Sequence, residues 1–465
     1  MALAAQRFRL LASAFSSVIF FVSTSSACAQ VGGVYFDAKG MLRETKSLSQ
    51  NEKLNLLRKM TSGNAASDDV ASKSNLRRIS LKRLERQVKA FRKKGEPLPA
   101  DLFHLAGLTQ IRFVFFYPQE HDVVIAGEAE GWTQTETGEV VGKKSGKPVL
   151  NLDDLIVALR YAFAEQVTTA FVGCSIDPTV EGTKRFNNFT RNIPRNLNRA
   201  QMLKVLKQAA KVAGPHRARI FGIDPSSGFA LKMLVADYRL KRIALAHDPS
   251  PVKGLTSYFD LLARKRNLRQ VPQHRWWFVG HYDAIEYSAD ELAYEFTGQG
   301  LKVATAPTEK NFKTDNRKGK RKKASKEAEK FASDFTQHFP QLAKKVPVFA
   351  ELKNLISLTV TAELIAQKHF ERVSSDEAQH WHPTFFLDKK ACPIEKFAVP
   401  KWMPALVNYR FINNRNWLIS VSGGVELDPA ALLTKHTLKL NKTEEFQNRH
   451  RSTTLPTDKQ TWWWD

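Results

Sequence analysis

The sequence predicts a mixed α/β fold: a partly parallel sheet layered with helices, a smaller antiparallel β part, and a C-terminal helical and β portion. Two observations favour this class. Apolar strand-like segments alternate with helix-like segments between residues 98 and 265, a pattern typical of layers with parallel strands. After residue 265, strand-like segments follow one another directly, as they do in antiparallel sheets.

Residues 1–29 have the order of a secretory signal peptide. Arg7 and Arg9 precede an apolar run that ends at residue 22, and Ala27-Cys28-Ala29 forms an A-x-A cleavage site. The apolar run is shorter than the roughly 20 residues that a membrane-spanning helix needs. We therefore expect cleavage after Ala29 and a periplasmic or secreted protein. An uncleaved anchor and lipidation at Cys28 are the alternatives.

Residues 30–97 are expected to contain a hairpin, a linker and a basic helix. Residues 31–42 alternate enough for a short hairpin with its turn at Lys39-Gly40. Residues 62–74 are rich in small polar side chains, which predicts a flexible linker. An amphipathic helix is predicted across residues 77–93, where apolar positions are set among Arg and Lys: Ile79, Leu81, Leu84, Val88 and Phe91.

Residues 98–265 are expected to form an α/β domain. Asn151 stands where a helix N-cap is expected, and Gly214-Pro215 ends a second helix that is expected to begin at Asn198. A long helix is expected to end near Leu245. The predicted elements, in order, are a strand at 111–117 with its hairpin partner at 122–126, a helix after 151, a strand at 168–176, a helix at 198–213, a strand at 219–223 and a helix at 229–245.

Residues 266–440 are expected to form a mixed β/α portion, and residues 441–465 a polar tail. The first contains predicted strands at 275–287 and 293–296, a basic loop at 310–330, a helix at 347–370, and a closing hairpin of 417–421 with 425–427. The tail ends in Trp462-Trp463-Trp464, which we expect to dock on a sugar or on the body of the protein, because exposed tryptophan side chains are costly in water.

The composition describes a folded and strongly basic protein. A hydrophobic content of 43% is enough for a core, so global disorder is excluded, and the formal net charge is +25. This charge admits an anionic polymer or an envelope component as partner, and predicted export disfavours genomic DNA. No second apolar stretch qualifies as a membrane span, and the composition leaves the oligomeric state open.

Two carboxylates follow predicted strands in the same way. Asp177 and Asp224 each end an apolar strand as Ile-Asp-Pro, so in a parallel sheet they would face one crevice as acid/base groups. The competing interpretation is that each caps the next helix, since Asp followed by Pro is a common helix start. Asp428-Pro429 repeats this signature without any sign of a site. We therefore favour capping over catalysis.

Other candidates for catalysis or metal binding are weaker. Asp237 and Lys241 stand four residues apart on a predicted helix and are interpreted as a surface ion pair rather than an activated lysine. His380-Trp381-His382 lacks the spacing of a zinc site. No nucleophile elbow, phosphate-binding loop or dinucleotide fingerprint is present, so no metal and no cofactor are expected.

Two further features each have two interpretations. Cys174 and Cys392 could form a disulfide in an oxidising compartment, or could be two buried thiols. The basic loop could be a solvated charge run, or could hold an anionic polymer. The residues that would bind it are Arg317, Lys318, Lys320, Arg321, Lys322 and Lys323.

Several segments, taken together, resemble a known family. They include residues 105–108 (LAGL), 174–179 (CSIDPT), 236–243 (ADYRLKRI), 275–278 (RWWF) and 422–425 (SGGV). This set is similar to a family of secreted planctomycete-type proteins known as domain-of-unknown-function family 1598. The resemblance covers about residues 98–428 and implies no catalytic residue. The basic loop and the tryptophan tail are not part of it.

The sequence thus favours an exported, non-enzymatic binding or structural module of the bacterial cell envelope. One alternative is an extracytoplasmic hydrolase that uses Asp177 and Asp224. The other is a binder of anionic glycan or nucleic acid through the basic loop. A deep pocket that gathers both carboxylates and a base such as His281 would favour the enzyme.

Overall fold

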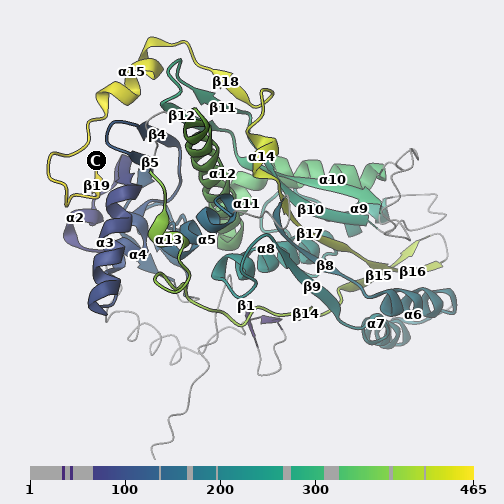
Figure 1. The fold of residues 1–465 in the computed structure, drawn as a ribbon. Helices are drawn as coiled ribbons and strands as arrows, with labels where there is room; N and C mark the ends of the chain where they lie inside the picture. The colour runs from purple at the N-terminus through teal and green to yellow at the C-terminus, as the bar shows by residue number, and fades with distance from the viewer. Residues whose placement is uncertain are drawn as a thin grey trace, which may run out of the picture.

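The computed structural model describes residues 34–36, 42–44, 66–135, 138–164, 171–194, 197–264, 274–307, 324–375, 381–412 and 415–465. The predicted signal peptide and the six basic residues from Arg317 to Lys323 lie outside the described residues. The predicted basic loop at 310–330 is wrong over its last five residues, because helix α10 (Lys326–Gln337), capped by Ser325, begins there. The predicted mixed α/β class is confirmed, with two main sheets and a layer of helices against them (Figure 1).

The N-terminal part is built of strands as well as helices. β1 (Val34–Phe36) and β2 (Leu42–Glu44) pair antiparallel, which confirms the predicted hairpin. The linker prediction is wrong over residues 66–74, since α2 (Asp68–Ala71) forms there and β3 (Ser74–Ser80) begins. The basic helix is α3 (Leu81–Lys94), so residues 77–79 belong to β3 and not to the helix. Ser80 caps α3, and Gly95 ends it in the left-handed region at φ 71°.

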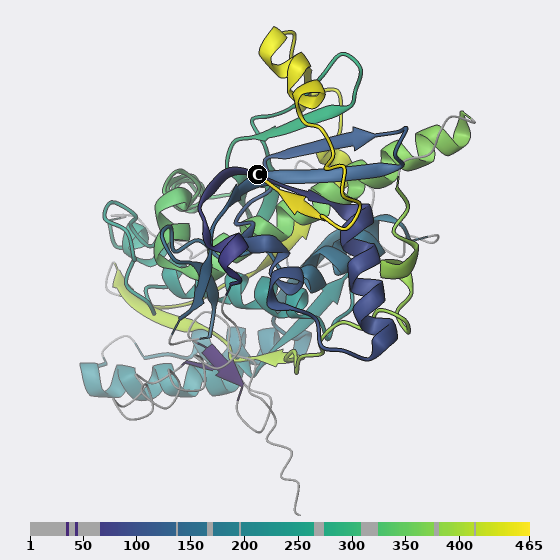
Figure 2. The same cartoon turned by 90° about the vertical axis from the view of Figure 1, so that its left-hand side faces the viewer.

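A seven-stranded sheet has the order β18-β11-β12-β4-β5-β3-β19. The hairpin of β4 with β5 confirms the prediction for residues 111–126. The tryptophan tail folds back onto the body, because β19 pairs with β3; the yellow end of the chain lies beside the dark N-terminal elements in Figure 2. The strands not yet given are β4 (Phe113–Tyr117), β5 (Asp122–Ala129), β11 (Ala284–Tyr287), β12 (Ala293–Thr297), β18 (Leu438–Leu440) and β19 (Trp463–Trp464).

A six-stranded sheet has the order β13-β10-β17-β8-β9-β14. β10 and β17 are parallel, and the other neighbouring pairs are antiparallel. β17 lies between β10 and β8, so the predicted hairpin of residues 417–421 with 425–427 is wrong. The strands are β8 (Val172–Asp177), β9 (His216–Phe221), β10 (His274–His281), β13 (Gly300–Pro307), β14 (Trp402–Met403) and β17 (Ser422–Leu427).

The connection from β8 to β9 overturns the expected parallel arrangement of these two strands. It contains two helices, α6 (Val180–Arg191) and α7 (Arg199–Ala213), which pack against each other. A single helix would return the chain to the start of β8, whereas two helices bring it back to the end where β8 finished. β9 therefore begins beside the end of β8, with Asp177 opposite Arg217.

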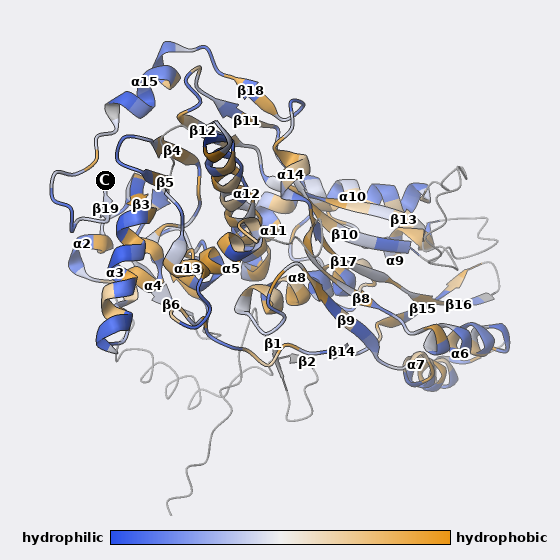
Figure 3. Ribbon diagram, in the orientation of Figure 1, coloured by the Kyte–Doolittle hydropathy of each residue, from blue (hydrophilic) through white to orange (hydrophobic). Residues whose placement is uncertain are grey.

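Helices pack on one face of the six-stranded sheet and form the core with it. Trp276 and Phe278 of β10 contact Phe331 and Phe335 of α10, and Phe278 also contacts Phe349 of α12. The hydropathy colouring shows hydrophobic residues along α8 and mainly hydrophilic ones on α15 (Figure 3). The main helices are α5 (Leu152–Ala162), α8 (Gly228–Ala244), α9 (Tyr258–Ala263), α10 (Lys326–Gln337), α11 (Phe339–Lys345) and α12 (Pro347–Ser374).

The remaining elements are short. They are α4 (Ala100–Phe103), η1 (Leu105–Gly107), β6 (Trp132–Gln134), β7 (Val140–Gly142), α13 (Thr384–Leu387), β15 (Val407–Ile412), β16 (Arg415–Ser420), α14 (Pro429–Leu432) and α15 (Glu444–Ser452).

Within the described ranges, no helix combines the length and apolar character needed to cross a membrane.

Candidate binding surface on the six-stranded sheet

The two Ile-Asp-Pro carboxylates lie at opposite ends of their strands. Because β8 and β9 are antiparallel, Asp177 is opposite Arg217, and Phe221 is opposite Gly173. Four residues of strand, about 14 Å, separate these two pairs, and Asp224 follows Phe221. The two carboxylates therefore do not face one crevice. His281 lies at the end of β10, opposite Gly300, at the end of the sheet where Asp224 follows β9, but β17 and β8 separate β10 from β9. It therefore joins neither carboxylate.

Capping of a helix by Asp177 or Asp224 is also wrong, although Asp428 does cap α14 through the N–H of Ala431. The cap of α6 is Thr179, whose hydroxyl accepts from the N–H of Gly182 at 2.9 Å. The cap of α8 is Ser227. One residue separates Asp177 from the cap residue Thr179, and two separate Asp224 from the cap residue Ser227, so neither aspartate is at the cap position.

Asp224 instead closes a turn before α8. Its Oδ1 accepts hydrogen bonds from the N–H and the hydroxyl of Ser226, and Lys396 pairs with its other oxygen. Burial alone would raise its pKa, but these hydrogen bonds and the Lys396 charge lower the pKa of Asp224 to about 2. Asp224 is therefore ionised at neutral pH and is unsuited to general-acid catalysis.

The cap assignment predicts different costs for two neighbouring substitutions. Thr179→Ala is expected to lower the free energy of unfolding by about 0.5–2 kcal/mol, because a Gly182 N–H loses its acceptor. Asp177→Ala is expected to stay within about 0.5 kcal/mol of the wild type. Urea titration of both variants checks this, and an Asp177→Ala loss as large as that of Thr179→Ala would contradict it.

Asp237 and Lys241 form a buried pair, so their interpretation as a surface pair is wrong. The exposed fractions of their side chains are 0% and 2%, and Lys241 Nζ donates to Asp237 Oδ2 at 2.6 Å and to the Ile176 carbonyl at 3.2 Å. Burial raises the pKa of Asp237, and the Lys241 charge opposes this. Gly423 has no room for a side chain: a Cβ atom there would lie 2.8 Å from Asp237 Oδ1. The pair thus packs directly under β17.

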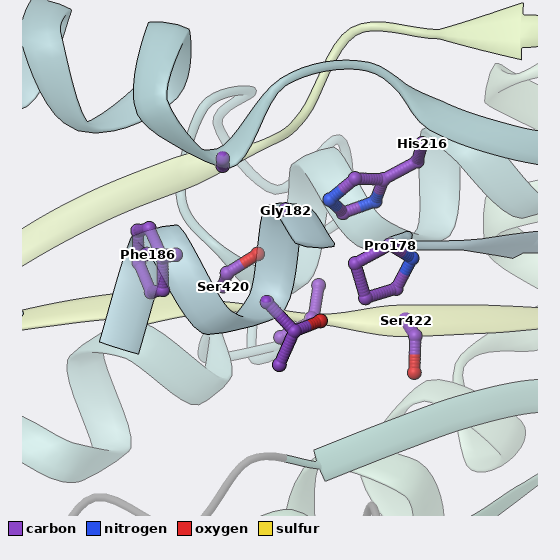
Figure 4. Close-up of a pocket in the computed structure, with 9 residues that line it drawn as sticks. Pro178, Gly182, Phe186, His216, Ser420 and Ser422 are labelled. Carbon is purple, nitrogen blue, oxygen red and sulfur yellow. The ribbon is translucent and has the colours of Figure 1, made fainter. Parts of the chain in front are cut away.

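A small cavity of about 30 Å³ lies between the end of β8, α6 and the start of β17 (Figure 4). His216 lines it together with Pro178, Ser420 and Ser422. Burial, and then the Lys241 charge, lowers the pKa of His216 to about 3, so this imidazole is neutral at physiological pH. The cavity is about the size of one water molecule, and neither Asp177 nor Asp224 lines it. It is too small for a substrate.

The two cysteines of the folded part are not bridged, so the candidate disulfide is corrected to two free thiols. Cys174 lies in β8 and Cys392 follows α13, and both are buried. Burial raises the pKa of Cys392 to about 11, and burial likewise raises that of Cys174. Both are therefore protonated and poorly nucleophilic at neutral pH.

The histidines near residue 380 give no metal centre in the part of the chain that the structure describes. His380 lies outside the described residues, and the ring centroids of His382 and His369 are 4.9 Å apart. Across the described ranges, no cluster of three or more His, Cys, Asp or Glu side chains is placed to hold a metal ion.

The six-stranded sheet has one face that the helices do not occupy. Side chains alternate between the faces of a strand, and Trp276 and Phe278 point toward α10 and α12. Arg275 and Trp277 therefore point to the opposite side, which we call the outer face. In the described part of the chain, no helix packs against it as α8 and α10 pack on the inner face.

The strand register arranges the outer face in three rows. The first row, from β13 to β9, contains Lys302, Val279, Glu426, Gly173 and Phe221. The second contains Ala304, Trp277, Gly424, Ser175 and Arg219. The third contains Ala306, Arg275, Ser422, Asp177, Arg217 and Trp402. Four cationic side chains thus share this face with two carboxylates, those of Asp177 and Glu426.

The outer face combines exposed charge, aromatic surface and one unsatisfied hydroxyl. Arg217, Arg219 and Lys302 are exposed. The Arg275 guanidinium lies 5.6 Å from the centre of the half-buried Trp277 ring. Ser175 lies between Trp277 and Arg219 in the second row, and its buried hydroxyl has no hydrogen-bond partner among the described residues. Arginine beside an aromatic ring suits recognition of a sulfate, phosphate or carboxylate on a flat, ring-containing chain.

These residues were missed by the sequence analysis, although a signal was present. In residues 216–221 (HRARIF), arginine alternates with apolar or small residues at period two, and in residues 274–281 (HRWWFVGH) Arg275 precedes an apolar run. That period predicts a strand with one solvated face. Only the antiparallel register, which depends on α6 and α7, shows that the solvated faces of β9 and β10 are the same face of one sheet.

Comparison with known proteins gives a match to a family model over a segment that includes two strands of this sheet, β8 and β9. Neither the curated proteins nor the solved structures give a match to the chain. One family model, described as "Protein of unknown function (DUF1598)", matches residues 174–258. The matched segment includes most of β8, then α6, α7, β9 and α8. The resemblance identified from the sequence is therefore confirmed over residues 174–258, where the chain is similar to the DUF1598 family.

Proposed function

We propose that this protein is a non-enzymatic binding module that holds an acidic glycan of the cell envelope across the outer face. The observation that carries the proposal is the common placement of Arg217, Arg219 and Arg275 on a sheet face that has no helix layer in the described part of the chain. A flat cationic face of this kind suits a polymer better than a small molecule, which requires a concave site.

The size and chemistry of the outer face fit an extended chain. Six strands at about 4.8 Å spacing give a width of about 24 Å. Trp277 provides a ring on which a sugar can stack, and the arginines can pair bidentately with sulfate or carboxylate groups. The predicted export favours a glycan of the envelope over a nucleic acid.

The predicted basic loop is a second candidate for binding the same class of polymer. Its cluster from Arg317 to Lys323 lies outside the described residues, so its contribution is tested by a separate variant.

Removing the three arginines is expected to weaken binding and to flatten its salt dependence. In a full-length Arg217→Gln/Arg219→Gln/Arg275→Gln variant, the slope of log affinity against log salt should become shallower by about two to three, since each lost contact removes about 0.7–0.9. Fluorescence anisotropy with a labelled heparin oligosaccharide measures this. A labelled single-stranded oligonucleotide serves as the second probe, and tighter binding of the oligonucleotide than of the glycan would overturn the glycan assignment.

The matched control removes the same charge from a neighbouring element. Lys204, Lys207 and Lys211 are exposed on α7, away from the outer face. Their triple glutamine variant should keep most of the affinity and nearly the wild-type slope. An equal loss in both triple variants would show that net charge alone attracts the polymer. A loss seen only when the Arg317 to Lys323 cluster is neutralised would move the site to the loop.

A further inference from the structure

Two pockets adjoin on the side of α12 that is remote from the outer face. One has a volume of about 180 Å³ and lies between α11, α12 and the loop at residues 145–148. The other has a volume of about 340 Å³ and lies between α12, β12 and residues 110–112. Gln110 and Lys353 line both pockets, so the two pockets meet at these side chains.

The two pockets differ in chemistry. The surface of the smaller pocket is mostly carbon, to which Pro148, Phe339, Pro340, Ala343 and Ala350 contribute, although polar residues, among them Lys147 and Lys344, also line it. The larger is lined by polar groups, among them Arg112, Glu295, Thr297 and Ser357. An apolar compartment that opens into a polar one suits a ligand with an apolar tail and a polar head.

Most charged groups at the polar end already have partners. Arg112 pairs with Glu295 at 2.7 Å, and Tyr282 and Ser357 share a hydrogen bond at 3.2 Å. These pairs leave little demand for a counter-charge from a ligand. They also fix the walls of the pocket, because Glu295 is 8% exposed and Tyr282 is 6% exposed.

Lys353 is the exception. Among the described residues, its ammonium group has neither a hydrogen-bond acceptor nor an ion-pair partner, although α12 holds it where the two pockets meet. Burial, and then the nearby Lys147 charge, lowers its pKa, and Glu128 opposes this only in part. Lys147 is itself paired with Glu128 at 2.5 Å. A lysine in this position gains from an anion that arrives with a ligand.

We propose that these joined pockets bind a monoanionic amphiphile of the fatty-acid class. The carboxylate head would pair with Lys353, and the aliphatic tail would lie along Phe339, Pro340 and Ala343 in the apolar pocket. Gln110, at the same junction, can donate to the second carboxylate oxygen. This site is separate from the outer face and does not depend on the proposed function.

Calorimetric titration of the full-length protein with decanoate tests the proposal. Decanoate is expected to bind, and Lys353→Gln should weaken this binding about tenfold or more, because the charge-assisted hydrogen bond is lost. Ala343→Phe, which fills the apolar pocket, should weaken decanoate binding while leaving Lys353 in place. Lys345→Gln is the matched control, since Lys345 is exposed on α11 and does not line either pocket.

Two further ligands separate the roles of head and tail. Decanol, which lacks the charge, and acetate, which lacks the tail, should each bind at least tenfold more weakly than decanoate. The proposal is overturned if decanoate does not bind, if either ligand matches it, or if Lys353→Gln binds it as the wild type does. Thermal melts of each variant confirm that a loss of binding is not a loss of folding.

Discussion

Replacing Lys241 by methionine is expected to lower the free energy of unfolding by about 3–5 kcal/mol, because it leaves the carboxylate of Asp237 buried without a counter-charge. Asp237 is 0% exposed, and its Oδ1 has no hydrogen-bond partner among the described residues even in the wild type. Lys241 forms the ion pair with its other oxygen, Oδ2, and also donates to the Ile176 carbonyl. Urea titration measures the effect.

The chain contains a matched pair for comparison. Lys330 and Asp334 have the same four-residue spacing on α10, but the Lys330 side chain is 57% exposed. Lys330→Met is therefore expected to cost no more than about 0.5 kcal/mol. An Asp237→Ala/Lys241→Met double variant should be more stable than Lys241→Met alone, since it buries no lone charge. Equal costs for Lys241→Met and Lys330→Met would contradict the assignment of a buried pair.

The loss in Lys241→Met should also depend on pH. Burial raises the pKa of Asp237 in the folded state, and removing Lys241 removes the charge that opposes this shift. A carboxyl whose folded pKa is raised destabilises the protein as pH rises above the unfolded value, near 3.9. The free energy of unfolding that Lys241→Met loses relative to the wild type should therefore be larger at pH 8 than at pH 5. A deficit that is constant with pH would mean that lost packing, and not the charge, causes it.

Replacing Arg77 by methionine is the second substitution expected to have a large effect, about 3–5 kcal/mol. Arg77 is fully buried in β3, and its guanidinium holds both oxygens of the Asp465 side chain at 2.8 and 2.9 Å. It also donates to the carbonyls of Val70 and Ala106. Without Arg77, these carbonyls are left unsatisfied, and the tail at β19 loses its anchor. Equilibrium unfolding and proteolysis of the tail measure the two consequences.

Arg83 provides the control for this experiment. It also holds the tail, through the carbonyls of Pro456, Asp458 and Thr461, but its side chain is only partly buried. Water can replace it at these acceptors, so Arg83→Met should cost about 1 kcal/mol or less. If Arg83→Met releases the tail as readily as Arg77→Met does, the buried guanidinium is not the anchor.

Asp465 gives the tail a predicted acid sensitivity. Burial alone would raise the pKa of Asp465, but hydrogen bonds from Arg77 and Ser74 and the charges of Arg77 and Arg78 lower it. A lowered carboxyl pKa contributes stability that is present above the unfolded value, near 3.9, and is lost as pH falls through the folded value. Docking of the tail should therefore weaken only in acid.

Local signals in the sequence predicted several elements well. Asn151 caps α5 as expected, and Gly214 ends α7 as expected, at φ 69°. A cap or a helix stop depends on hydrogen bonds between residues a few positions apart, so the local sequence is enough to predict it. The same logic failed for Asp177 and Asp224, because a cap depends on where the first helical turn begins, and one or two residues of loop displace it.

Arrangement over longer distances could not be predicted in the same way. Helix α6 was not predicted from the sequence. With one helix alone in the connection, β8 and β9 were expected to be parallel, whereas they are antiparallel. The burial of Arg77 was also missed, because basic residues in a row favour a solvated helix until a partner such as Asp465 is known. Both the outer face and the pockets around Lys353 combine residues from distant segments, so the tertiary fold defines them.

Hydroxyl-radical footprinting with a heparin oligosaccharide tests most directly whether an acidic glycan lies on the outer face. The exposed Trp402 and the half-buried Trp277 both belong to this face, whereas Trp462, Trp463 and Trp464 lie at the far sheet and serve as internal controls. The oligosaccharide is expected to reduce oxidation of Trp277 and Trp402 and to leave that of the three control tryptophans unchanged. Unchanged oxidation of Trp277 and Trp402 at saturating oligosaccharide would contradict the proposal.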